Sequence, residues 1–198
     1  ESLTDALNSM SGTSAILLGA ILGAMMGFDL GGPINKVAYA FATAGLATAG
    51  AASDSPQLKI MAAVMAAGMV APLAMALSTT LRPQLFSEPE RENGKAAWLL
   101  GFSFISEGAI PFAAADPVRI IASSVVGSSI CGALAMAFSL GIRAPHGGAW
   151  VLPIMGSLSQ MALFLVALAI GVVVMAAIVI FLKSRDSRLA EVDAVATV

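Results

Sequence analysis

The sequence predicts an all-α polytopic membrane protein whose transmembrane helices alternate with re-entrant or broken hairpins. Hydrophobic residues make up 58% of the 198 residues and charged residues only 11%, whereas soluble domains carry about 25% charge. The mean hydropathy is +0.90. Short polar segments rich in Gly and Pro interrupt the apolar runs. Because irregular backbone is tolerated at membrane depth only inside protein or against a water-filled cavity, these segments predict a buried polar site.

The first half of the chain contains three apolar runs. Residues 6–28 are uncharged and long enough to cross a hydrocarbon core of about 30 Å. Within this run Gly19 and Gly23 form a GxxxG pattern, which predicts close helix packing. A polar turn follows, and then residues 37–53 form a shorter run rich in small side chains. Residues 60–81 predict a full span.

The second half begins with the hydrophilic residues 82–95, which we expect to form a solvated loop. Residues 96–106 are too short to cross the membrane before Glu107, and the Gly- and Pro-rich sequence that follows predicts a re-entrant hairpin. Residues 120–142 and 157–182 predict two more spans.

The chain is expected to be one membrane domain over residues 11–183. Residues 1–10 are expected to connect it to a preceding part of a longer protein, since no signal-peptide pattern is present. Residues 184–198 are expected to form a poorly ordered tail. Basic residues in 82–95 and directly after residue 182 both favour the cytoplasm. They fall on the same side if the hairpin is re-entrant, which predicts a cytoplasmic C-terminus.

The charge balance and the rare residue types exclude several functions. The 10 basic and 12 acidic residues nearly cancel, which argues against a nucleic-acid partner. The single cysteine, Cys131, excludes an internal disulfide and is expected to be a packing residue. One cysteine and one histidine do not supply the ligands of a structural zinc site. We therefore expect neither a metal nor a cofactor.

Three polar islands interrupt the membrane-type sequence, at residues 29–36, 107–119 and 143–148. A solute with many hydroxyl groups needs carboxylate acceptors and Lys, Arg, His or Asn donors that converge where water is excluded. Broken helices add backbone N–H and C=O groups directed at the same cavity. The three islands are therefore candidates for one binding site.

Several of these polar residues also have structural interpretations. Asp29 and Lys36 either bind the solute, pair with each other or lie at the membrane interface. Asn35, which follows a proline, is a candidate helix cap as well as a ligand. Asp116 and Arg119 are three residues apart, so a structural ion pair at the end of the hairpin is the alternative to substrate contact.

Glu107 is the strongest candidate for function. An acidic side chain at membrane depth is costly and by default marks a functional site, and the adjacent Gly108 opens the backbone. His146, the only histidine, lies in a bent Pro-His-Gly-Gly segment, where substrate contact or proton handling competes with a structural hydrogen bond. Tyr39 and Trp150 are expected to be interfacial anchors, and stacking on a sugar is the alternative for Trp150.

Three segments containing these residues, GFDLGGPINKVAYAF (27–41), FISEGAIPFAAADP (104–117) and APHGG (144–148), closely resemble one known family. It is the membrane component, enzyme IIC, of bacterial sugar phosphotransferase systems, fructose family, and the likeness is to its C-terminal part. The resemblance implies that this chain is part of a larger IIC domain. On its own it is then expected neither to transport nor to phosphorylate, and it carries no phosphorylated residue.

The resemblance also implies a setting and a mechanism. Such proteins are homodimers in the inner membrane, surrounded by lipid, and re-entrant hairpins hold the sugar. The sugar is phosphorylated by a IIB partner that receives phosphate through enzyme I, HPr and IIA. Carried to the matching motifs, the residues that contact sugar hydroxyls are Glu107 and His146. Glu107 is then the candidate catalytic residue, as acceptor for a sugar hydroxyl.

Two other function classes stay open at the level of sequence. An ion-coupled secondary sugar transporter would use Glu107 as its proton or sodium site. A non-catalytic membrane scaffold or sensor is the other class. Among phosphotransferase sugars, fructose or a fructose-like sugar is expected.

Overall fold

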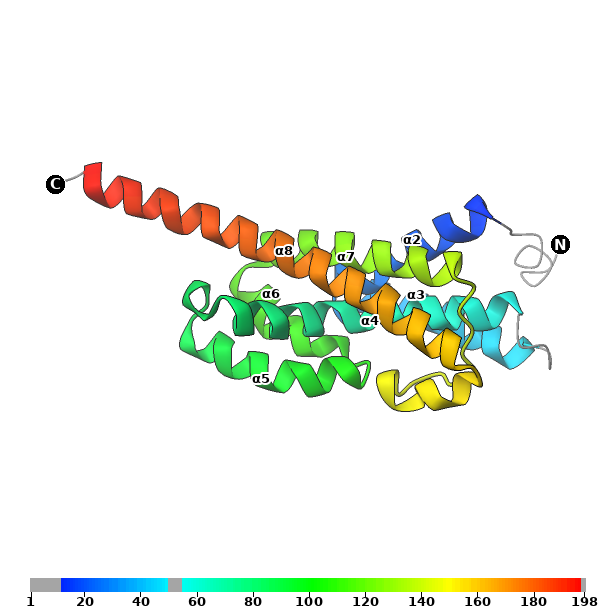
Figure 1. Ribbon diagram of the computed structural model, residues 1–198. Coiled ribbons are helices and arrows are strands. Elements are labelled where there is room, and N and C mark those ends of the chain that lie inside the picture. Colours follow the sequence, from blue (N-terminus) through cyan, green and yellow to red (C-terminus); the bar gives the residue numbers. More distant parts are fainter. Residues whose placement is uncertain (1–11, 50–54, 197–198) are drawn as a thin grey trace.

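The computed structural model describes residues 12–49 and 55–196, so the predicted connecting segment 1–10 lies outside the described residues. Within these ranges the chain is helical and contains no β-strand, which confirms the predicted all-α class (Figure 1). The elements follow in this order: α2 (Thr13–Phe28), α3 (Pro33–Thr48), α4 (Pro56–Leu81), η1 (Pro83–Leu85), α5 (Glu88–Phe102), η2 (Ser106–Ala109), α6 (Ile110–Ala115), α7 (Pro117–Ala137), η3 (Gly148–Met155) and α8 (Leu158–Ala196).

Three of the described helices are long and apolar enough to cross a membrane. They are α4, α7 and the apolar part of α8, Leu158–Asp186. Helices are therefore found over most of the predicted spans 60–81, 120–142 and 157–182, and their passage through a bilayer stays a prediction. The helix α2 is apolar but shorter. The backbone of α8 continues as helix to Ala196, through most of the predicted tail.

Helix α4 forms the centre of the bundle, and α2, α3, α5, α7 and α8 all pack against it (Figure 1). It carries one charged residue, Lys59, near its start, and 94% of its most apolar stretch is buried. Gly68, near the middle of the helix, makes room for other groups. A Cβ atom there would lie 2.4 Å from the Phe104 ring and 2.7 Å from the Met26 methyl group.

Glycines bring α2 and α7 into close contact, as the GxxxG pattern predicted. A Cβ atom added at Gly19 would lie 2.4 Å from the carbonyl oxygen of Gly132. A Cβ atom added at Gly23 would lie 2.2 Å from the carbonyl oxygen of Ser128. Gly27 continues the same face of α2, one turn further on. Since backbone atoms cannot yield as a flexible side chain does, these three positions require glycine at this helix separation.

The expectation of a loop over residues 82–95 was wrong, because α5 begins at Glu88. The helix starts with a capping box, in which the Ser87 N–H donates to Glu90 Oε2 over 2.8 Å. Such a reciprocal pair satisfies N–H groups that an uncapped helix end leaves without partners. The first turns of α5 are polar because they lie at the end of the bundle, and their polarity conceals the helix in the sequence.

The segment from α5 to α6 leaves one end of the bundle and returns to it (Figure 1). Lys183 Nζ on α8 lies 3.4 Å from Glu90 Oε1, in the first turn of α5, and 4.0 Å from Asp116 Oδ2, directly after α6. Between these ends the segment packs against the middle of α4, where Ser106 Oγ donates to the Gly68 carbonyl over 2.8 Å. This path has the shape of the predicted hairpin, and its entry into a bilayer stays a prediction.

Candidate functional site

A cavity of about 210 Å³ lies where the tip of the α5–α6 hairpin meets the turn between α2 and α3. It brings together residues from all three polar islands. Four of the predicted site residues line it: Glu107, His146, Asn35 and Lys36. The sequence analysis did not assign the other five to a site: Met26, Gly31, Tyr39, Phe104 and Ser106.

The Glu107 carboxylate rests directly on Gly31. The backbone of Gly31 has a φ of +105°, and a Cβ atom there would lie 2.6 Å from Glu107 Oε1. Within the part of the chain that the structure covers, the carboxylate accepts no hydrogen bond and forms no ion pair. The side chain is exposed among the described residues, and its burial in a larger domain stays a prediction. Glu107 lines the cavity and lies in η2, between α5 and α6.

The side chains of Asp29 and Asn35 connect α2 to α3 by hydrogen bonds to backbone groups. Asp29 Oδ2 accepts from the Ile34 N–H over 2.7 Å, and its Oδ1 accepts from the Asn35 N–H over 2.9 Å. In return, Asn35 Nδ2 donates to the carbonyl of Met26 in the last turn of α2, also over 2.9 Å. Asn35 is thus a capping residue that also lines the cavity. Asp29 caps α3, and no described ion pair joins it to Lys36.

Three rings form one side of the cavity. The His146 imidazole lies 5.1 Å from the Phe104 ring and 6.5 Å from the Tyr39 ring, and the two phenyl groups are 6.1 Å apart, all between centroids. Tyr39 therefore lines the cavity, and its role as an interfacial anchor stays a prediction. Phe104 is buried and has a φ of +62°, an uncommon conformation for an aromatic residue that places its ring against Gly68.

Two glycines position His146. Gly147 and Gly148 have φ values of +122° and +60°, and a Cβ atom at Gly148 would lie 2.2 Å from the Phe102 carbonyl oxygen. The loop can therefore dock against the end of α5 only with glycine at this position. Trp150 Nε1 donates to Ser103 Oγ over 3.0 Å and ties the start of η3 to the same place. The Pro-His-Gly-Gly sequence is thus explained by the packing that holds the imidazole.

Asp116, Arg119 and Gly108 are not among the residues that line this cavity, and their assignment as substrate ligands stays a prediction. Arg119 Nη1 lies 2.7 Å from Asp116 Oδ2, so the structural ion pair is the interpretation that the geometry supports. Arg119 also pairs with Asp186 on α8. Gly108 is buried against Leu100. The six residues of α6 separate Glu107 from Asp116 and Arg119, so these residues are near in sequence but do not line the same cavity.

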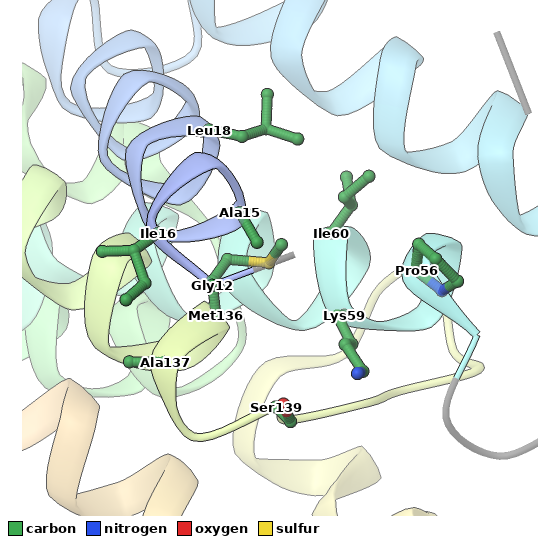
Figure 2. A pocket seen from close by; sticks show the side chains of 10 residues that line it. All are labelled: Gly12, Ala15, Ile16, Leu18, Pro56, Lys59, Ile60, Met136, Ala137 and Ser139. Atoms are coloured by element: carbon green, nitrogen blue, oxygen red, sulfur yellow. The ribbon is translucent and has the colours of Figure 1, made fainter. Parts of the chain in front are cut away.

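A second cavity, of about 250 Å³, lies where α2 and α4 begin and α7 ends (Figure 2). Its lining is apolar apart from Lys59 and Ser139. Figure 2 shows Ile16, Leu18 and Ile60 around it. It contains none of the predicted site residues and no carboxylate, so it does not offer the mixed acceptors and donors that a hydroxylated solute needs.

The cavity at Glu107 has the chemistry that such a solute requires. Glu107 supplies an acceptor and His146 either a donor or an acceptor, and Lys36 adds a positive charge to the lining. Tyr39 and Phe104 add apolar faces, which suit the C–H surface of a sugar ring. Ligand sites that combine apolar walls with a few convergent polar groups are the common kind.

The chain is similar to proteins named as fructose-specific components of the phosphotransferase system (PTS). It is 52% identical over 169 residues to the EIIB′BC component of Vibrio cholerae, covering 85% of this chain and 28% of that protein. It is 48% identical over 196 residues to the EIIB′BC component of Escherichia coli, covering 99% and 33%. It is also 48% identical over 190 residues to the EIIC component of Haloferax volcanii, covering 95% and 48%.

The chain thus spans between about a quarter and a half of the length of these relatives. No family model and no solved structure matches it. Since one of these relatives is named as an EIIC component alone, the shared part is the IIC region. With its apolar helices and these identities over most of its length, the chain belongs to the fructose-specific PTS family, as part of the IIC membrane component.

Proposed function

We propose that this chain forms the sugar-holding part of a fructose PTS permease, which passes fructose or a fructose-like sugar across the membrane while a IIB partner phosphorylates it. The observation that carries the proposal is the cavity that joins Glu107 to His146 in a chain whose relatives are named fructose-specific. Glu107 is proposed to accept a hydrogen bond from a sugar hydroxyl, and His146 to contact a second hydroxyl.

The level of the cavity in the bundle supports a transport role. Ser106, next to Glu107, bonds to Gly68 at the middle of the 26-residue helix α4. Transporters place their substrates near the bilayer midplane, where broken helices meet. We propose that the α5–α6 segment is a re-entrant hairpin, and the contacts of both its ends with Lys183 favour that path.

The partners and the location follow from the family. The name EIIB′BC of two relatives supports a IIB domain as the direct phosphate donor, with IIA, HPr and enzyme I before it. Residence in the inner membrane, among lipid, with a cytoplasmic C-terminus and a homodimeric full-length protein, is proposed on the resemblance. An ion-coupled transporter, which the polar islands alone permit, has no support from the names of the relatives.

The test uses the full-length protein with a fructose IIB domain in inverted membrane vesicles. Wild type is expected to convert fructose to fructose phosphate only when phosphoenolpyruvate and the soluble phosphotransferase proteins are supplied. Loss of one charged hydrogen bond corresponds to about 1.5–3 kcal/mol, or roughly a ten- to hundredfold loss of affinity. Glu107→Gln is therefore expected to lose most activity and still insert into the membrane.

Glu92→Gln serves as the matched control, because Glu92 is an exposed carboxylate on α5 that pairs with Lys95. This variant is expected to keep wild-type activity. Fructose uptake driven by a proton or sodium gradient, without phosphoenolpyruvate, would point to the ion-coupled transporter instead. Full activity in Glu107→Gln would remove Glu107 from the site.

A further inference from the structure

We infer that Lys36 is the anion-binding arm of the cavity and that it receives the phosphate group of the phosphorylated sugar. This inference rests on the proposed function and assigns a separate part of the site to the product. Glu107 and His146 would hold hydroxyl groups, which both the sugar and its phosphate ester possess. Lys36 would discriminate between them, because only the ester carries a negative charge.

The charges around the cavity single out Lys36. Lys36 lies in the cavity lining with the carboxylate of Glu107, the imidazole of His146 and the hydroxyl of Tyr39. Lys36 forms no hydrogen bond or ion pair with any residue in the ranges 12–49 and 55–196, although Asp29 and Glu107 belong to neighbouring segments. Within the described residues its ammonium group therefore has no structural partner and can bind a ligand. A lysine is a compact point charge of the kind that binds phosphate in many proteins.

The position of Lys36 in the bundle requires a polar surrounding. It is the fourth residue of α3, whose start packs against Met26 at the end of α2, and Met26 in turn contacts the mid-level Gly68. An ammonium group at that level is costly if it faces hydrocarbon and cannot reach headgroups as a lysine near a helix end does. Lys36 lines the cavity and is exposed among the described residues, so its ammonium group is accessible to a ligand there.

The N-terminus of α3 does not provide a competing anion site. Helix N-termini attract anions through their free N–H groups, but here the Asp29 carboxylate already accepts from the Ile34 and Asn35 N–H groups. Asp29 also places a negative charge at this helix end, which would repel phosphate. The side chain of Lys36 is thus the one group on α3 that can attract an anion into the cavity.

The proposed reaction makes such a group necessary. Phosphorylation converts a neutral sugar into an ester that carries close to two negative charges at neutral pH, next to the carboxylate of Glu107. Without a cation, the cavity would repel its own product before release and would disfavour the approach of the phosphate group. Lys36 offsets that repulsion and leaves the binding of the neutral sugar nearly unchanged.

The experiment measures equilibrium binding to the purified full-length protein in detergent. Radiolabelled fructose is the reporter, and the competitors are fructose 1-phosphate, fructose 6-phosphate and inorganic phosphate. For Lys36→Gln we expect the dissociation constant of at least one fructose phosphate to rise about ten- to hundredfold, while that of fructose changes less than about twofold. Lys36→Arg is expected to retain most of the affinity for the ester, and Lys95→Gln, at an exposed lysine on α5, all of it.

Retained fructose binding shows that Lys36→Gln is folded. Wild-type ester binding in that variant would overturn the inference, as would equal losses for fructose and its esters. Competition by inorganic phosphate as strong as that by the esters would overturn it too, since the site would then bind free anions. If wild type binds neither fructose nor its phosphates, the proposed function falls, and the assignment of Lys36 falls with it.

Discussion

Replacing Gly31 by alanine is expected to move the Glu107 carboxylate and to leave the rest of the cavity in place. The new Cβ atom would lie 2.6 Å from Oε1. That oxygen is the far end of a flexible side chain, so the carboxylate can yield without separation of the helices. Gly31→Ala thus changes the position of the Glu107 carboxylate and leaves its charge unchanged.

The size of the displacement follows from the contact distances. Ordinary contacts of a Cβ atom begin at 3.4 Å, so the oxygen must retreat by about 0.8 Å, the difference between the two distances. A misplacement of about 1 Å in an active site can reduce a rate about a hundredfold. We expect Gly31→Ala to lower the initial rate of fructose phosphorylation about ten- to hundredfold, measured in vesicles that contain the full-length protein and a IIB domain.

Gly156→Ala separates this effect from backbone strain. Gly156 has a φ of +75° and ends η3, where a Cβ atom would meet nothing within 4 Å. Both variants place alanine at a positive φ, which costs about 1–2 kcal/mol of folding stability. Only Gly31→Ala is expected to lose activity. Equal activity in the two variants would refute the contact between Gly31 and Glu107 as a determinant of function.

Two further predictions concern stability, measured by thermal unfolding of the full-length protein in detergent. Lys183→Met leaves the largely buried Glu90 carboxylate without its cation, whereas Asp116 keeps Arg119, and is expected to cost about 3 kcal/mol. Lys95→Met breaks an exposed pair and is expected to cost at most about 0.5 kcal/mol, so similar losses in both would contradict the role of Lys183. Gly23→Leu would place a Cβ atom 2.2 Å from the Ser128 carbonyl oxygen and is expected to abolish the folded protein. Leu17→Ala, at a residue that is 59% exposed, is expected to be tolerated, and a stable Gly23→Leu protein would disprove the packing of α2 on α7.

The long helices could be predicted from the sequence because one physical property, the length of an uncharged run, determines them. That property fails where a helix is partly polar. The helix α5 begins at Glu88 with a polar turn, and its apolar part is too short to stand out. The pattern that identifies its start is the capping box of Ser87 and Glu90, which is local and does not depend on hydropathy.

The site was predicted in part, because the broken backbone marks it. Glu107 and His146 could be found as isolated ionisable groups in apolar surroundings. Their meeting with Tyr39 and Phe104 depends on how far each helix runs before it turns, and no local pattern contains that information. Asp116 lies away from this cavity for the same reason, since α6 returns the chain to the opposite end of the hairpin. The Gly31-Gly32 pair could have predicted a turn with a positive φ at Gly31, which the structure has.

Helix α4 is strongly apolar, but the other helices cover it, so it is shielded from lipid. Reagents that partition into acyl chains and react on illumination should label the outward faces of α8 and α7 and pass over α4, although hydropathy alone ranks all three as spans. Substitutions should follow the same division. Outward positions should accept most aliphatic residues of any volume. Along α4 a single added methylene should be destabilising, because five helices pack around it.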